Sequence, residues 1–285
     1  MHQNLVTPQR VSRHECTALR WAQTAVASTA IADLLAGAPQ EAHLLGASRF
    51  ALYLGLDASK GGVTVIAVLA ADAVRLPLGL VIAGRLPDLS PTSTASVGGG
   101  EVCVGPLAIR ATRWFDARPL LVEPFQLDRI DAAARLLGGL PAEAHGLPDE
   151  PLDSIATCLI NGDPTPSLRV IGRGPGLTPA GDDLVAGALA AIALRGRLHR
   201  AAVQAVLAHA VSATTSLSSS LLWCAAAGQV VPQANRFLVA LCGATPVDSA
   251  LDDLRAVGGT SGTALALGLV AGARAVVCAP QEATL

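Results

Sequence analysis

The hydrophobic pattern of this chain changes near residue 122, and that change restricts the folds open to it. In the first part, short apolar runs alternate with glycine, proline and serine, as strands and turns do. These runs lie at residues 49–56, 63–69, 79–83, 101–104 and 107–112. They predict a small, mostly antiparallel β-barrel or sandwich, with residues 90–100 as a loop. Residues 12–36 instead predict a helix, with Ser12 as its cap and Gly37 as its stop.

From about Gln126 onward, apolar residues recur at the spacing of helices. Helices are predicted at residues 130–137, 152–160, 184–194, 200–211, 215–227, 234–241, 249–256 and 261–277. The predicted fold class is therefore α+β, with a β-rich, barrel- or sandwich-like N-terminal part followed by an all-α C-terminal part. The predicted domains are residues 1–122, an N-terminal helix plus the β-rich part, and residues 123–285, the all-α part.

The composition excludes some classes of function. Hydrophobic residues make up 51% of the 285 residues, charged residues 15%, and the net charge is −2 with no basic block. A nucleic-acid surface is excluded, because neutralising phosphates needs clustered lysine and arginine. The surplus of apolar residues predicts a large buried interface, as in a homo-oligomer or a subunit of a larger complex.

Neither the apolar stretches nor the cysteines indicate a membrane or secreted protein. No stretch reaches the roughly 20 uninterrupted apolar residues that cross a bilayer, and no secretory signal is visible at the N-terminus. The six cysteines are scattered, with no CxxC pair. This distribution indicates reduced thiols in a cytoplasmic protein.

Residues 172–183, with the sequence GRGPGLTPAGDD, are the strongest candidate for a functional site. Three alternate glycines permit positive φ, and Thr178 followed by Pro179 predicts a helix start. A glycine-rich loop that leads into a helix N-terminus presents free N–H groups to a phosphate or carboxylate. The first helical turn adds Asp182 and Asp183 as candidate catalytic or metal-binding carboxylates, which point about 100° apart.

The remaining candidate residues lie in three places. Residues 258–262 form a second glycine-rich helix start, residues 214–220 form a run of hydroxyl side chains on a predicted helix, and Asn161 precedes a glycine at a turn. Each also has a structural explanation, namely ordinary capping, tight helix packing or a simple turn. The predicted anion- or substrate-binding residues are Gly172, Arg173, Gly174, Gly176, Leu177, Thr178, Thr215, Ser218, Gly258, Thr260, Ser261, Gly262 and Asn161.

Residues 172–183, the helix with Thr214, Thr215 and Ser218, and the 258–262 cluster resemble the AllH-type subunit of oxamate carbamoyltransferase. That bacterial family was formerly catalogued as a domain of unknown function, and the resemblance covers roughly residues 161–272. It implies purine (allantoin) breakdown by a complex that interconverts oxalurate plus phosphate with oxamate plus carbamoyl phosphate. It also implies two unrelated partner subunits, and a small anion held by the 172–178 backbone and Arg173.

Two positions depart from the family pattern. Members often carry a histidine where this chain has Gly259 and an aspartate where it has Ala264. The substrate is therefore left open to another carbamoyl or carboxylate compound. Two other functions fit the same residues: a non-catalytic ligand-binding or scaffold subunit, and a Mg²⁺-dependent all-α hydrolase in which Asp182 and Asp183 hold the metal.

Overall fold

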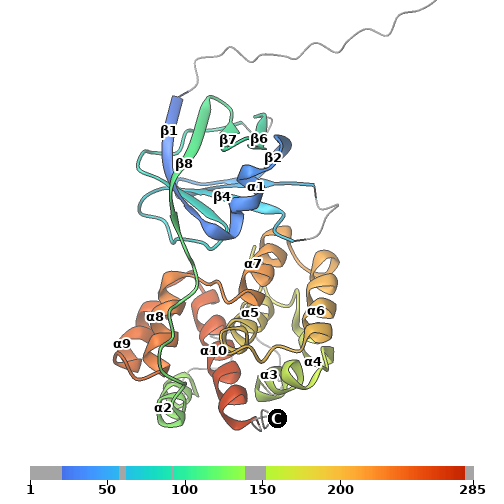
Figure 1. The fold of residues 1–285 in the computed structure, drawn as a ribbon, viewed down its shortest axis with the longest axis vertical. Coiled ribbons are helices and arrows are strands. Elements are labelled where there is room, and N and C mark those ends of the chain that lie inside the picture. The colour runs from blue at the N-terminus through green and yellow to red at the C-terminus, as the bar shows by residue number, and fades with distance from the viewer. Residues whose placement is uncertain (1–20, 58–61, 91–92, 139–151, 280–285) are drawn as a thin grey trace, which may run out of the picture.

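The structure is a computed structural model that describes residues 21–57, 62–90, 93–138 and 152–279. A β-barrel lies at one end of the molecule and a group of helices at the other, joined by an extended segment after β8 (Figure 1). The strands are β1 (Trp21–Ser28), β2 (Gln40–Ala47), β3 (Ala51–Gly55), β4 (Val65–Leu69), β5 (Gly79–Ile82), β6 (Ala95–Gly98), β7 (Glu101–Val104) and β8 (Leu107–Phe115).

The eight strands close into one barrel in the order β1-β5-β4-β3-β2-β6-β7-β8. The pairs β1–β8 and β4–β5 are parallel, and the other pairs are antiparallel. The fold-class prediction is corrected on this point, because the N-terminal part is a closed mixed barrel and neither a sandwich nor a simple antiparallel arrangement. Parallel neighbours need long crossover connections, which local sequence patterns do not reveal.

The predicted N-terminal helix is wrong over Trp21–Ser28 and is confirmed only near its end. Residues 12–20, with Ser12, lie outside the described residues, and Trp21–Ser28 form β1 between β5 and β8. Only the 3₁₀ turn η1 (Thr29–Ile31) and the short helix α1 (Ala32–Ala36) follow, and α1 ends at Gly37 as expected. β6 likewise forms where a loop was predicted. In both places pairing with neighbouring strands overrides weak local preference.

The helical part contains α2 (Leu127–Gly138), α3 (Leu152–Asn161), α4 (Thr165–Val170), α5 (Ala180–Ala193), α6 (Arg200–Ala213), α7 (Ser216–Ala226), α8 (Pro232–Leu241), α9 (Val247–Arg255) and α10 (Ser261–Cys278). α5 and α10 are buried side by side at its centre (Figure 1). Within the described ranges, α10 is long and apolar enough by composition to cross a membrane, but 61% of it is buried inside the protein. It packs here as a core helix.

Glycines let α5 and α10 approach closely. A Cβ at Gly187 of α5 would lie 2.3 Å from the carbonyl oxygen of Leu265, and one at Gly268 of α10 would lie 2.0 Å from that of Leu184. Such distances are far below van der Waals contact, so only glycine fits at these crossings. Gly187 therefore allows the close approach of a neighbouring helix.

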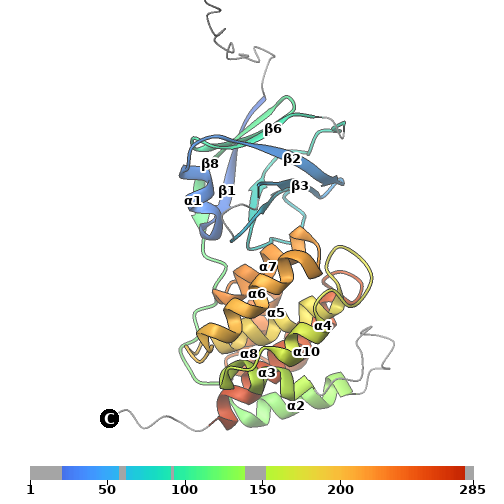
Figure 2. The same ribbon diagram turned by 90° about the vertical axis from the view of Figure 1, so that its right-hand side faces the viewer.

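α7 joins the two parts, because it lies between the barrel and the other helices (Figure 2). Leu217 and Cys224 are buried in the hydrophobic core of the barrel. Ser220 Oγ accepts a hydrogen bond of 3.0 Å from the backbone N–H of Thr64, in the segment before β4. The opposite face of α7, with Leu222 and Ala225, belongs to the helical core.

Candidate functional site

The loop between α4 and α5 has the backbone conformation that its glycines predict. Gly172, Gly174 and Gly176 have φ values of 78°, 117° and 94°, in the left-handed region that L side chains avoid. A Cβ at Gly172 would lie 2.1 Å from the carbonyl oxygen of Ala213, at the end of α6. The loop is therefore fixed in shape and pressed against α6.

α5 starts one residue later than the capping pattern predicts. Pro179, with φ −53° and ψ 142°, takes the N-cap position, and Ala180 is the first helical residue. The Thr178 hydroxyl does not cap the helix; it lies 3.0 Å from Ser261 Oγ at the start of α10. Thr178 thus connects the two glycine-rich helix starts, which sequence alone left unrelated.

Asp182 is buried, with 1% of its surface exposed, and its carboxylate accepts hydrogen bonds from several segments. Its Oδ1 accepts a hydrogen bond of 2.6 Å from the backbone N–H of Gly172. Its Oδ2 accepts hydrogen bonds from Thr214 Oγ1 and from Ser218 Oγ, the latter at 2.7 Å. One carboxylate therefore ties the loop, the end of α6 and the start of α7 to α5.

Asp183 has a different environment, although it is the next residue. Its Oδ2 is shielded from solvent and has no hydrogen-bond partner among the described residues. Burial raises the pKa of its carboxyl group from 3.8 to about 8, a hydrogen bond from Ser261 opposes that shift, and the nearby Asp182 adds to it. At neutral pH Asp183 is therefore largely protonated and uncharged.

The hydroxyl run at the start of α7 is used for hydrogen bonds in several directions. Thr214 and Ser218 donate to Asp182. Thr215 is the N-cap of α7, accepts from the Ser218 N–H, and donates to the carbonyl oxygen of Leu177 at 2.6 Å. Thr215 and Ser218 thus lie beside the 172–183 loop and make hydrogen bonds that fix its conformation, and a role in binding an anion stays a prediction.

The second glycine-rich start adds its serine to the same place. Thr260 occupies the N-cap position of α10 without a side-chain hydrogen bond to the backbone. Gly258 has φ 64°, and a Cβ at Gly262 would lie 2.0 Å from the carbonyl oxygen of Leu254. Of these residues, Gly258 and Ser261 line the same cavity as Asp183.

The loop before α5 is exposed to solvent at residues 173–177. Within the described chain, the backbone N–H groups of Gly174, Gly176, Leu177 and Thr178 have no acceptor. One of the exposed residues is Arg173, whose Nε donates to the carbonyl oxygen of Arg169 at 2.5 Å. The loop therefore offers a set of free donors beside one arginine.

Asn161 is not brought to this place. It is the last residue of α3 and is exposed, and Gly162 after it has φ 93° and lies close to the His199 ring. The turn that the sequence predicted is therefore present. Asn161 does not line the cavity beside Asp183.

The two aspartates do not form a ligand set for Mg²⁺. Asp182 already accepts three hydrogen bonds, and Asp183 is turned into a different environment. Across the described ranges, no three histidine, cysteine, aspartate or glutamate side chains come close enough together to hold a metal ion. Mg²⁺ prefers several oxygen ligands in octahedral geometry, which one available carboxyl group does not supply.

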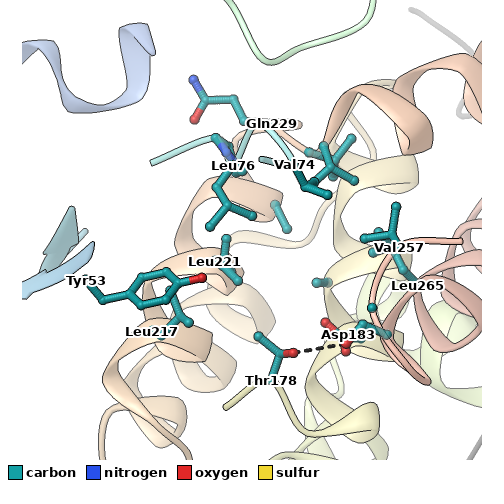
Figure 3. Close-up of a pocket in the computed structure, with 17 residues that line it drawn as sticks. Tyr53, Val74, Leu76, Thr178, Asp183, Leu217, Leu221, Gln229, Val257 and Leu265 are labelled. Atoms are coloured by element: carbon teal, nitrogen blue, oxygen red, sulfur yellow. Dashed lines mark hydrogen bonds between the residues drawn. The ribbon is translucent and has the colours of Figure 1, made fainter. Parts of the chain in front are cut away.

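Sequence reasoning missed the residues that complete the surroundings of Asp183. Tyr53 of β3, Val74 and Leu76 of the β4–β5 loop, and Gln229 after α7 line a cavity with it (Figure 3). No motif marks these positions. Tyr53, the single tyrosine of the chain, is part of an ordinary apolar strand pattern. Only the docking of the barrel on the helices brings them together.

The family model for oxamate carbamoyltransferase subunit AllH matches residues 170–273. Over these residues the chain is similar to that family, and the match covers less than half of the 285 residues. The match includes the 172–183 loop, α7 and the start of α10, and it ends within α10. Neither the curated proteins nor the solved structures contain a match to this chain. The family description also implies protein partners, since it names a subunit.

Proposed function

We propose that this chain is the anion-holding subunit of an oxamate carbamoyltransferase complex that acts with two partner subunits in the cytoplasm. The complex interconverts oxalurate plus phosphate with oxamate plus carbamoyl phosphate. One observation carries the proposal: the N–H groups of Gly174, Gly176, Leu177 and Thr178 have no acceptor in the described chain, and the first three residues are exposed while Thr178 is half-buried. All the small molecules of this reaction that contain a phosphate or carboxylate fit such donors.

The loop can hold negative charge without the cost of rearranging. Its shape is fixed by three left-handed glycines, by the Asp182 hydrogen bond to Gly172, and by Thr215 bound to the Leu177 carbonyl. The N-terminus of α5 adds the positive end of a helix dipole, and Arg173 adds a charged side chain at the exposed rim. Donors that are held in place before the anion arrives lose little entropy when they bind it.

In this proposal a phosphate oxygen attacks the carbamoyl carbon of oxalurate. The C–N bond to the oxamate nitrogen breaks, and that nitrogen takes up a proton, which gives oxamate and carbamoyl phosphate. Negative charge builds up on the carbamoyl oxygen in the tetrahedral transition state. The contribution of this chain is to position the anion and to stabilise developing charge with fixed N–H groups.

The test is to remove one loop N–H and keep everything else. Leu177→Pro deletes the donor but keeps the carbonyl oxygen that Thr215 binds, and Leu177→Ala keeps both. Leu177 is 61% exposed, so the alanine variant loses little packing. In the assembled complex, with oxalurate and phosphate supplied, carbamoyl phosphate formation is followed against phosphate concentration.

Loss of one hydrogen bond to a charged group is worth about 1.5–3 kcal/mol. We therefore expect Leu177→Pro to raise KM for phosphate about ten-fold or more, and Leu177→Ala to leave it within about two-fold. Equal KM values for the two variants would exclude anion binding by the loop. Carbamoyl phosphate formation by an assembled complex that lacks this chain would show that the chain is not needed for the reaction and would overturn the proposal.

A further inference from the structure

A cavity of about 260 Å³ lies between the barrel and the helical part, beside the start of α5. Figure 3 shows some of the residues that line it, among them Tyr53 and Leu76 from the barrel, Leu221 of α7 and Leu265 of α10. Asp183 lies beside Thr178 at one end. The cavity is therefore built by residues from two separate hydrophobic cores.

The walls of this cavity are apolar and carry no cation. Among its described lining residues there is no lysine, arginine or histidine, and the titratable ones are Asp183 and Tyr53. Burial raises the pKa of Tyr53, so its hydroxyl stays protonated. Asp182 is adjacent but is turned toward Gly172, Thr214 and Ser218. A phosphate or carboxylate ligand would therefore meet no countercharge here, and burying it would be costly.

The polar groups are gathered at the Asp183 end. The Thr178 and Ser261 hydroxyls bind each other at 3.0 Å, and the Ser261 hydroxyl lowers the pKa of the nearby Asp183 carboxyl group. Asp183 Oδ2 is left shielded from solvent without a partner in the described chain. Because Oδ2 is shielded, a ligand in the cavity meets the Asp183 carboxyl group at its other oxygen, Oδ1.

We propose that this cavity binds an uncharged ligand that ends in a primary carboxamide group, O=C–NH₂, with the Asp183 carboxyl group as its anchor. In this arrangement the Asp183 O–H donates to the amide oxygen, and the amide N–H donates to the hydroxyl oxygen of Thr178 or Ser261, which line the same end of the cavity. The apolar remainder of the ligand lies against Val74, Leu217 and Val257. The site goes beyond the anion-holding loop and requires neither phosphate nor partner subunits.

Two other end groups are disfavoured by the same surroundings. A carboxylate end would place a second acid against Asp183 and Asp182 with no cation nearby. An ammonium end would require Asp183 to ionise inside apolar walls, and the resulting buried ion pair loses much of its hydration. An amide pairs with the protonated acid and adds no net charge.

The experiment compares three probes of equal length on the full chain: pentanamide, pentanoate and pentylamine. Binding is measured by isothermal titration calorimetry, with ligand-observed saturation-transfer NMR for weak binding. At neutral pH we expect pentanamide to bind at least about ten-fold more tightly than either other probe, the effect of one buried hydrogen-bonded pair. No binding of pentanamide, or equal binding of pentanoate or pentylamine, overturns the proposal.

The pH dependence identifies the anchor. The acid form of Asp183 supplies the O–H donor, so pentanamide affinity is highest below the pKa of about 8 and falls as pH rises through it. Asp183→Asn keeps the shape, and its side-chain amide can still donate a hydrogen bond to the ligand, so pentanamide affinity should stay within a few-fold and lose this pH dependence. A fall with pH that persists unchanged in Asp183→Asn overturns the assignment of the anchor.

Three further variants separate the cavity from the rest of the molecule. Asp183→Leu removes the anchor and should lose pentanamide binding, and Val74→Trp should lose it by filling the cavity. Asp128→Asn, at an exposed aspartate in the first turn of α2, is the matched control and should bind normally. Pentanamide binding that survives both Asp183→Leu and Val74→Trp, each shown to be folded by its thermal transition, overturns the proposal.

The two proposals fail independently. Leu177→Pro should leave pentanamide binding unchanged, because the Leu177 N–H does not line the cavity. If phosphate binding is lost in Leu177→Pro while pentanamide binds normally, both proposals stand. If pentanamide does not bind while KM for phosphate still responds to Leu177→Pro, the cavity proposal alone is overturned.

Discussion

α5 and α10 begin in the same way but carry different groups. In each helix the second residue is a glycine, Gly181 or Gly262, whose N–H donates to a carbonyl oxygen of the preceding loop. A Cβ at Gly181 would lie 1.9 Å from the carbonyl oxygen of Val170, and one at Gly262 would lie 2.0 Å from that of Leu254. These glycines let the helix start against the segment before it.

The next two residues differ. α5 continues with Asp182 and Asp183, and α10 with Thr263 and Ala264, of which Ala264 is fully buried. Only α5 therefore has a carboxylate that ties four segments together and a second one that faces a cavity. The glycines therefore provide close packing at the starts of both helices, and the acidic residues make the start of α5 a candidate site.

The largest effect is expected at Asp182. Asp182→Ala leaves the Gly172 N–H, Thr214 and Ser218 without their acceptor in a buried place. We expect the free energy of unfolding to fall by about 3–5 kcal/mol, measured by urea denaturation. Thr263→Ala, at the equivalent position of α10, should cost about 1 kcal/mol or less. Similar losses of unfolding free energy for the two variants would show that residues 182 and 263 stabilise their helix starts equally.

Asp183 should make stability depend on pH. Its pKa rises from 3.8 to about 8 on folding, so between these values the folded protein binds more protons than the unfolded one. Stability then falls as pH rises through this window, with a slope of up to about 1.4 kcal/mol per pH unit. Asp183→Asn removes this contribution, so it should become more stable relative to the native protein between about pH 5 and about pH 8.

Urea denaturation of both proteins at several pH values measures this difference, and Asp128→Asn is again the control. A stability difference between Asp183→Asn and the native protein that stays constant with pH would mean that Asp183 is ionised in the folded protein. Asp182 and Asp183 would then both be ionised, and the proposed difference in charge between them would be wrong.

The shared glycine construction should respond alike at both starts. Gly181→Ala and Gly262→Ala each push a methyl group into a carbonyl oxygen, and we expect each to lose about 1–3 kcal/mol of stability. Gly259→Ala is the control, because no atom lies within 4 Å of its added Cβ and its φ is not positive. Thermal denaturation of the three variants checks this. A neutral Gly262→Ala would show that the two starts are built differently.

The smallest effect concerns the link between the starts. Thr178→Val removes the hydroxyl that lies 3.0 Å from Ser261 Oγ, and we expect a loss of about 1 kcal/mol. Thr260→Val should change stability by less than about 0.5 kcal/mol, because Thr260 makes no side-chain capping bond. Differential scanning calorimetry resolves the pair. Equal losses would assign the two threonines the same role.

The helices were more predictable from the sequence than the strands. The predicted helices at residues 200–211 and 261–277 lie close to α6 and α10, since their apolar spacing is local information. β1 was read as a helix because its alanine-rich sequence has little strand preference, and its partners β5 and β8 lie far along the chain. The order of strands in a closed barrel depends on such distant pairings.

Only part of the candidate site, likewise, could be predicted from the sequence. The left-handed conformations of Gly172, Gly174 and Gly176 and the start of a helix near Ala180 followed from the sequence, because steric limits on φ act within a few residues. Which aspartate braces the loop and which faces a cavity did not. That choice depends on Thr214, Ser218, Ser261 and the barrel, which reach Asp182 and Asp183 only after the helices pack and α7 docks the barrel. Burial and hydrogen bonding, which set the charge of each carboxyl group, are properties of that packed arrangement.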